Sequence, residues 1–137
     1  MISKDFNEKL SLFLTLDDLK KLTTKDGSLS LYSLNYEEGF HDNEGALKES
    51  INKYLLTSQL DQFSNTERII LLDVCMGMGY NSGCILEELF KRDHKIEWHG
   101  LEIDKRPLKI GLNEKIFQKL WSPKVLNFFH CLNQSGE

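Results

Sequence analysis

Apolar residues change their spacing along this chain, and each change predicts a different element. Residues 68–74 hold four consecutive aliphatic residues between Arg68 and Asp73. Such a short apolar run with polar ends is typical of a strand buried on both faces of a parallel sheet. Residues 85–90 place apolar side chains at helical spacing among charged ones, which predicts an amphipathic helix. Residues 97–104 form a second short strand that ends in the carboxylates of Glu102 and Asp104.

The stretch from Asp73 to Asn81 joins the first strand to the helix through a glycine loop. Gly77 and Gly79 can adopt backbone angles closed to other residues, and without a Cβ atom they let a ligand approach the main chain. Asn81 is a favourable N-cap for the helix that follows. Because the loop lies at the carboxyl end of a strand, where open α/β sheets bind ligands, we expect a binding site there.

The second strand adds an acidic residue to this candidate site. Glu102 follows Gly79 at about the spacing at which nucleotide-binding folds place an acid on a ribose diol, and Asp104 is the second choice for this role. The alternative interpretation is a plain glycine turn and a solvent-exposed glutamate. A dinucleotide loop is less favoured, because Gly83 comes one residue late for the third glycine of that motif.

The segment before the first strand predicts a helix, a hairpin and a loop. Thr15 begins a capping arrangement, and Leu16, Leu19 and Leu22 follow on one helical face. The dipeptide Asp26-Gly27 then predicts a tight hairpin. Residues 35–49 begin as a loop, and a helix that opens at residues 45–47 carries Ile51, Tyr54, Leu55 and Ser58.

The segment after the second strand is predicted to be helical. Pro107 lies near the first turn of a predicted helix that runs to Leu120. In the first turn the missing N–H of proline costs nothing. Residues 121–123 break this helix. Residues 125–132 are strongly apolar and fit either a helix or a strand, and residues 133–137 are expected to be a frayed end.

Composition narrows the class of protein. The 137 residues fit one domain, and the formal net charge of −4 does not indicate nucleic-acid binding. The basic pairs at residues 20–21, 91–92 and 105–106 are expected on a solvated surface.

The sequence lacks a membrane-spanning run and a signal peptide, so we expect a cytoplasmic protein. Cys75, Cys84 and Cys131 have no metal-ligand spacing and are expected to be free thiols.

Several separated blocks resemble one enzyme family. Asp73-x-Cys75-x-Gly77-x-Gly79 resembles the acid-x-Gly-x-Gly-x-Gly signature of class I S-adenosylmethionine-dependent methyltransferases, with Cys75 where the first glycine usually stands. Together with Tyr80-Asn81 and the upstream blocks at residues 26–33, 40–41 and 45–49, the chain is similar to the methyltransferase half of the MnmC-type tRNA 5-methylaminomethyl-2-thiouridine enzymes. The resemblance covers about residues 22–110.

The resemblance implies a fold, a cofactor and a reaction. The fold is α/β, the N-terminal part of a Rossmann-like class I methyltransferase fold preceded by a β-hairpin and a helix, with a cap region over residues 1–60 and the first part of the cofactor domain over 61–137. The cofactor is S-adenosylmethionine, and the methyl acceptor is the aminomethyl group of a modified wobble uridine in tRNA. The implied cofactor-binding residues are Asp73, Cys75, Gly77, Gly79, Tyr80, Asn81, Glu102, Ile103 and Glu49; Tyr32 and His41 are implied to line the substrate cleft.

Several of these roles have simpler alternatives. Asp73 either orders the glycine loop or meets the ammonium group of the cofactor. The alternative for His41 is a capping or packing role, for Glu49 a solvated helix charge, and for Tyr32 a plain strand aromatic. The Cys75 side chain stands where close approach is otherwise unobstructed, and this predicts weaker cofactor binding.

A class I methyltransferase needs about seven strands, and this sequence predicts two parallel strands and a hairpin. In the resembling family an acidic residue after the fourth strand faces the amine, and we find no counterpart before Glu137. We therefore consider a truncated or split enzyme, a non-catalytic cofactor-binding protein, and a degraded relic. An incomplete sheet exposes an edge and an apolar face, so the expected partners are a second copy of the chain or a complementary chain, besides tRNA. A non-catalytic partner subunit and a nicotinamide-dependent oxidoreductase are the competing functions.

Overall fold

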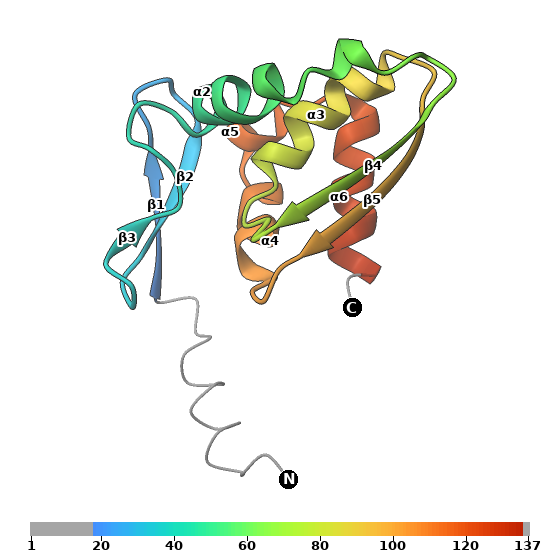
Figure 1. Ribbon diagram of the computed structural model, residues 1–137. Helices are drawn as coiled ribbons and strands as arrows, with labels where there is room; N and C mark the ends of the chain where they lie inside the picture. Colours follow the sequence, from blue (N-terminus) through green and yellow to red (C-terminus); the bar gives the residue numbers. More distant parts are fainter. Residues whose placement is uncertain (1–17, 136–137) are drawn as a thin grey trace, which may run out of the picture.

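The computed structural model describes residues 18–135, which form a mixed α/β structure (Figure 1). This part of the chain contains a three-stranded antiparallel sheet, a two-stranded parallel sheet and five α-helices. Thr15 and Leu16, with which the first predicted helix begins, lie outside the described residues. No helix within residues 18–135 is long and apolar enough to cross a membrane.

The predicted hairpin is confirmed. Strand β1 (Leu19–Thr23) pairs antiparallel with β2 (Leu29–Ser33), and β2 pairs with the short β3 (Glu38–Gly39). The turn between β1 and β2 holds Gly27 at a φ of 84°, a conformation that favours glycine. The helix predicted to carry Leu19 and Leu22 is wrong, because both residues belong to β1, where pairing with β2 outweighs their helical spacing.

The same turn caps the next helix. Helix α2 (Ala46–Ser50) continues through a π-helical turn (Ile51–Leu55) and a 3₁₀ turn (Leu56–Ser58), so the predicted helix is confirmed. A second 3₁₀ turn spans Leu60–Gln62. The first backbone N–H groups of α2 donate to side chains of the hairpin turn: Ala46 to Thr24 Oγ1 (3.3 Å), Leu47 to Ser28 Oγ (3.2 Å) and Lys48 to Asp26 Oδ2 (2.9 Å). These side chains satisfy the donors that a helix N-terminus leaves unpaired.

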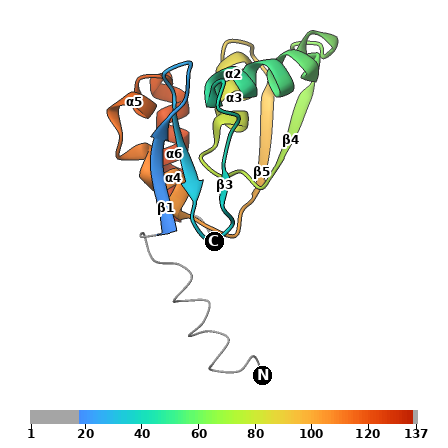
Figure 2. The ribbon, with the colours of Figure 1, turned by 90° about the vertical axis from the view of Figure 1, so that its left-hand side faces the viewer.

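The two predicted strands pair in parallel, as expected. Strand β4 (Arg68–Val74) lies beside β5 (Lys95–Leu101) in a register that sets Asp73 opposite Gly100. Helices α3 (Tyr80–Phe90) and α6 (Pro123–Ser135) both lie on one side of these strands (Figures 1 and 2). The expectation that β4 is buried on both faces is therefore wrong. Ile70, Leu72 and Val74 are each more than half exposed, because the described helices cover only the other face.

Two shorter helices replace the single one predicted after β5. Helix α4 (Arg106–Leu112) has proline in its first turn, as predicted, but it ends before α5 (Lys115–Gln118). Glu114 between them is extended, and Gln118 Nε2 donates to the carbonyl oxygen of Leu112 at 2.6 Å. The undecided segment at 125–132 is helical and belongs to α6. Residues 133–135, predicted to fray, complete that helix.

One hydrophobic core joins the hairpin sheet to the helices. Leu31 from β2, Met78 from the glycine loop and Phe129 from α6 are all fully buried in it. Tyr80, Phe117 and Trp121 form edge-to-face ring pairs at its centre. The Tyr80 hydroxyl donates to the carbonyl oxygen of Leu29 at 2.7 Å and so ties α3 to β2. The division into segments 1–60 and 61–137 stays a prediction, but residues from both segments share this core.

Candidate cofactor cleft

A cleft of about 620 Å³ lies between the hairpin sheet and the carboxyl ends of β4 and β5. Its size falls in the range of small-molecule sites, and its place is where α/β sheets bind ligands. Its walls come from the hairpin, the glycine loop and the turn between β5 and α4. The lining residues are Asp18, Leu19, Ser33, Asn35, Tyr36, Glu38, Gly39, Phe40, Cys75, Gly77, Glu102, Ile103, Asp104, Arg106 and Pro107.

The glycine loop turns sharply as β4 ends. Cys75 and Gly77 have φ values of 57° and 56°, in the left-handed region, and the Cys75 N–H donates to the carbonyl oxygen of Leu101 at 2.8 Å. Glycine adopts this conformation freely, whereas a residue with a Cβ atom is strained there. The missing first glycine of the signature is therefore a real departure, because Cys75 is held in a conformation that suits glycine.

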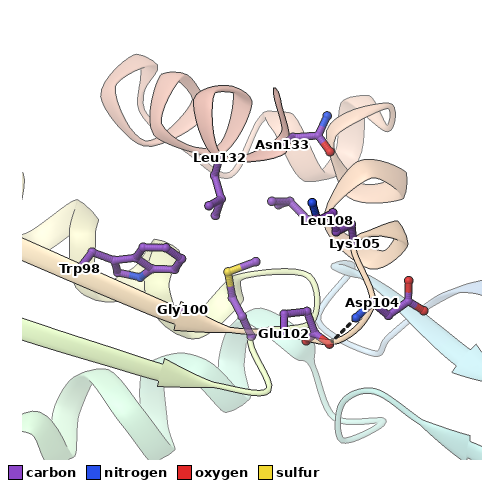
Figure 3. A pocket seen from close by; sticks show the side chains of 9 residues that line it. Trp98, Gly100, Glu102, Asp104, Lys105, Leu108, Leu132 and Asn133 are labelled. Atoms are coloured by element: carbon purple, nitrogen blue, oxygen red, sulfur yellow. Dashed lines mark hydrogen bonds between the residues drawn. The ribbon is translucent and has the colours of Figure 1, made fainter. Parts of the chain in front are cut away.

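Glu102 is the carboxylate that meets this loop. Its Oε2 accepts a hydrogen bond from the Gly77 N–H at 2.6 Å, and its Oε1 accepts from the N–H groups of Ile103 (2.7 Å) and Asp104 (3.0 Å). Figure 3 shows Glu102 beside Asp104 at the end of β5. The structure thus brings together the glycine loop and the acid that the sequence singled out. The three N–H bonds use three of the about four acceptor sites of a carboxylate, so one site is left for a further donor.

Asp73 lies beneath the loop rather than in the cleft. Its side chain is buried, and its Oδ2 accepts a hydrogen bond from Ser82 Oγ at 2.5 Å. The indole Nε1 of Trp98 donates to the same hydroxyl at 2.7 Å. Burial raises the pKa of Asp73, although the bond from Ser82 opposes this. Asp73 therefore links β4 to α3, which favours its loop-ordering role. Sequence reasoning missed Ser82. The indication that the sequence offers is that a small polar residue stands in the first turn of the helix.

None of the three predicted residues that follow Gly77 lines the cleft, and two of them face the core. A Cβ atom on Gly79 would lie 2.9 Å from the Phe129 ring, so this glycine permits close packing of α6 rather than approach of a ligand. Tyr80 is buried in the core. The N-cap role expected of Asn81 is wrong, because Gly79 occupies the N-cap position. The Asn81 Oδ1 accepts instead from Ser50 Oγ at 2.7 Å, which joins α3 to α2.

Of the remaining predicted residues, Ile103 lines the cleft, whereas Glu49, His41 and Tyr32 lie outside it. Glu49 pairs with Lys53 and accepts from the backbone N–H of Asp42. His41 Nδ1 lies 2.9 Å from Ser30 Oγ, and burial lowers the pKa of this histidine. Tyr32 is half-buried on β2, opposite Gly39 of β3. These placements match the packing alternatives for His41 and Tyr32.

An ion-pair network spans the cleft, and sequence reasoning missed it. Arg106 Nη1 donates to Asp18 Oδ1 at 2.6 Å, and its Nη2 donates to Asp104 Oδ2 at 2.7 Å. The three side chains are only 13–19% exposed, so the expectation of a solvated basic pair at 105–106 is wrong for Arg106. The hydrogen bonds with Asp104 and Asp18 raise the pKa of Arg106, which stays charged.

A second, small cavity of about 70 Å³ adjoins the first (Figure 3). Met76, Trp98, Leu108 and Leu132 give it an apolar lining, and Glu102 and Asp104 line both cavities. A Cβ atom on Gly100 would lie 2.1 Å from the Trp98 ring, so the absence of a side chain at this position makes room for the indole. Residues 18–135 contain no cluster of three or more side chains that could hold a metal ion.

The fold and the cleft together define a methyltransferase-like α/β structure. The crystal structure of MnmC2 from Aquifex aeolicus is similar, with a TM-score of 0.57 and 27% sequence identity over 74% of this chain and 37% of that one. An uncharacterised protein of Methanocaldococcus jannaschii, MJ0670, is 37% identical over 83 residues, which are 58% of this chain and 21% of that protein. No family model matches the chain. The chain thus spans well under half the length of both proteins.

Proposed function

We propose that this chain binds S-adenosylmethionine and forms the cofactor half of a methyltransferase that acts on the aminomethyl group of a modified wobble uridine in tRNA. The observation that carries the proposal is the meeting of Gly77 and Glu102 at the carboxyl ends of two parallel strands. The family resemblance over residues 22–110 and the similarity to MnmC2 support it.

The residues of the cleft fit this cofactor. The Glu102 carboxylate offers its remaining acceptor site to a ribose hydroxyl, and Gly77 lines the cleft without a side chain. When bound, S-adenosylmethionine supplies a methyl group activated by a sulfonium. Methyl transfer depends mainly on the positioning of two reactants and on the surrounding charge. The carboxylates that line the cleft suit the positive charge of such a cofactor.

Calorimetric titration of the purified chain with S-adenosylmethionine tests the proposal, with NADH as the control ligand. We expect binding of S-adenosylmethionine alone. Glu102→Ala should weaken binding by at least about tenfold, because hydrogen bonds to a charged group contribute about 1.5–3 kcal/mol. Glu97→Ala is the matched control, since Glu97 lies on the open face of β5 and should leave binding unchanged. Unchanged affinity in Glu102→Ala would refute the assignment.

A second function, a subunit without catalysis of its own, is favoured by the open face of β4 and β5. Ile70, Leu72, Val74 and Leu101 are exposed on it, as on a surface that another polypeptide covers. This candidate predicts no binding of S-adenosylmethionine and a specific partner in pull-down experiments. Methyl transfer to tRNA by the isolated chain would exclude it.

A further inference from the structure

Arg106 is the only cationic side chain among the described residues that line the cleft. Four carboxylates line it as well: Asp18 and Glu38 from the hairpin side, and Glu102 and Asp104 from the end of β5. Carboxylates that line one cleft repel one another, and each competes for a ligand that carries donors or positive charge. The distribution of the Arg106 hydrogen bonds therefore decides which carboxylate remains available.

The guanidinium divides its donors between two of these four acids. Its Nε contacts both oxygens of Asp104, at 3.0 and 3.1 Å, while Nη1 and Nη2 reach the two oxygens of Asp18 at 2.6 and 3.2 Å. Glu102, in contrast, accepts from backbone N–H groups, which orient its carboxylate without cancelling its charge.

The same network fixes the distance between the walls. Asp18 immediately precedes β1, and its Oδ2 also accepts from Asn35 Nδ2 of the hairpin at 2.9 Å. Its backbone oxygen accepts from the Leu34 N–H at 2.8 Å. Asp104 lies in the opposite wall, and its Oδ1 accepts from the Arg106 backbone N–H at 2.9 Å. Arg106 is thus bound to both walls by nearly buried, geometrically defined bonds.

We propose that Arg106 is the positioning residue of this cleft: it occupies Asp104, so that Glu102 rather than Asp104 meets the ligand's hydroxyl groups, and it holds the hairpin wall in place through Asp18. This inference rests on the proposed function. It adds a reason why Glu102, and not the neighbouring Asp104, binds the ligand. In this proposal Arg106 acts through Glu102 and the hairpin rather than on a reacting atom.

The affinity for S-adenosylmethionine tests the positioning role. Arg106→Gln should weaken binding by about tenfold or more, and Arg106→Lys, which keeps the charge but not the planar fork, should recover part of the loss. Lys21→Gln is the matched control. It breaks an ion pair between β1 and Glu114, with Nζ and Oε1 2.7 Å apart, which lies outside the cleft. This variant should change binding less than about twofold. Unchanged binding in Arg106→Gln would overturn the proposal.

A second pair of variants separates positioning from simple loss of structure. In the wild-type background Glu102→Ala should cost about tenfold in affinity. In the Arg106→Gln background Asp104 becomes available, so Glu102→Ala should cost less than about threefold. A merely structural arginine would leave the effect of Glu102→Ala unchanged, and that result would overturn the proposal.

A final measurement does not depend on the ligand. If the wild-type chain binds no S-adenosylmethionine, the proposed function fails, and the tie between the walls is then judged by thermal unfolding. We expect the melting point of Asp18→Asn/Arg106→Gln to fall by less than the sum of the two single falls, because both variants break the same bonds. Strictly additive falls would show that Arg106 does not join the walls.

Discussion

At the scale of single residues, the glycine loop contains one residue that does not suit its conformation. Cys75 has a φ of 57° and an exposed side chain at the cleft. A left-handed conformation costs a residue with a Cβ atom about 1–2 kcal/mol, which glycine does not pay. The identity of this residue therefore affects both the stability of the loop and the room left for a ligand.

Replacement of Cys75 by glycine should be favourable. We expect Cys75→Gly to leave the free energy of unfolding unchanged or raise it by about 1 kcal/mol, because relief of strain offsets the greater freedom of the unfolded chain. Its affinity for S-adenosylmethionine should rise. Cys131→Gly is the control: Cys131 is exposed in α6, where glycine lowers stability by about 1 kcal/mol. Urea denaturation and calorimetry give both quantities, and equal losses of stability in the two variants would contradict the prediction.

The residue scale also shows the limit of sequence reasoning about the site. Gly77 and Glu102 could be predicted, because a glycine loop after a strand and an acid at the end of the next strand must meet at one sheet edge. The ion pair between Arg106 and Asp18 could not be predicted. The two residues lie 88 positions apart in the sequence, and their contact depends on how the hairpin packs against the rest of the fold. Tyr80 followed the motif in sequence, but helix geometry turns its side chain into the core.

At the scale of elements, the hairpin turn and helix α2 form one unit. Asp26 is the centre of this unit: its Oδ1 accepts from Thr24, from the Ser28 N–H and from the Ser28 hydroxyl, and its Oδ2 accepts from the Lys48 N–H. Partial burial opposes ionisation, but these hydrogen bonds prevail and lower the pKa of Asp26 to about 2. The carboxylate is thus bound more tightly in its ionised form in the folded protein.

This lowered pKa predicts loss of stability in acid. The contribution of Asp26 is fully present above its ordinary pKa of about 4 and is lost as the pH falls toward about 2, because protonation removes the acceptor. After allowance for its exposed position we expect about 1 kcal/mol. Asp26→Asn should remove this amount at neutral pH and flatten the acid decline between pH 4 and 2. Asp61→Asn is the control, and an identical acid profile in wild type and Asp26→Asn would contradict the prediction.

Local sequence patterns predicted which helices and strands form better than they predicted the residues at which these elements begin and end. The Asp-Gly turn, β4, β5 and α3 follow from short-range spacing. The division of the helix after β5 at Glu114 does not, because the Gln118 side chain that bonds the end of α4 is placed by the fold. The choice of helix for α6 was open in the sequence, and its packing decides it: Phe128 meets Trp98 edge to face, and Phe129 lies in the core.

At the scale of the whole molecule, the parallel sheet is covered on one side only within the described residues. The open face carries Ile70, Leu72, Val74 and Leu101, each 58–64% exposed. An apolar run in the sequence indicates that a strand is buried, but it does not show whether both faces are covered. An exposed apolar face beside strand edges favours association.

We therefore expect the isolated chain to self-associate as its concentration rises. Leu72→Lys, at the middle of the open face, should keep the chain monomeric without loss of helical signal. Leu56→Lys removes an equally exposed leucine from a 3₁₀ turn and should leave association unchanged. Sedimentation velocity over a range of concentrations measures this, and a wild-type monomer throughout that range would contradict the prediction.

The position of the two tryptophans gives the molecule a built-in optical signal. Trp98 borders the small cavity beside Glu102, and its indole is bound to Ser82, whereas Trp121 is enclosed in the core. Fluorescence from the first responds to events at the end of β5, and fluorescence from the second responds to the integrity of the core. A Trp121→Phe chain would isolate the first signal and a Trp98→Phe chain the second, so events at the end of β5 and unfolding of the core could be followed separately without an attached dye.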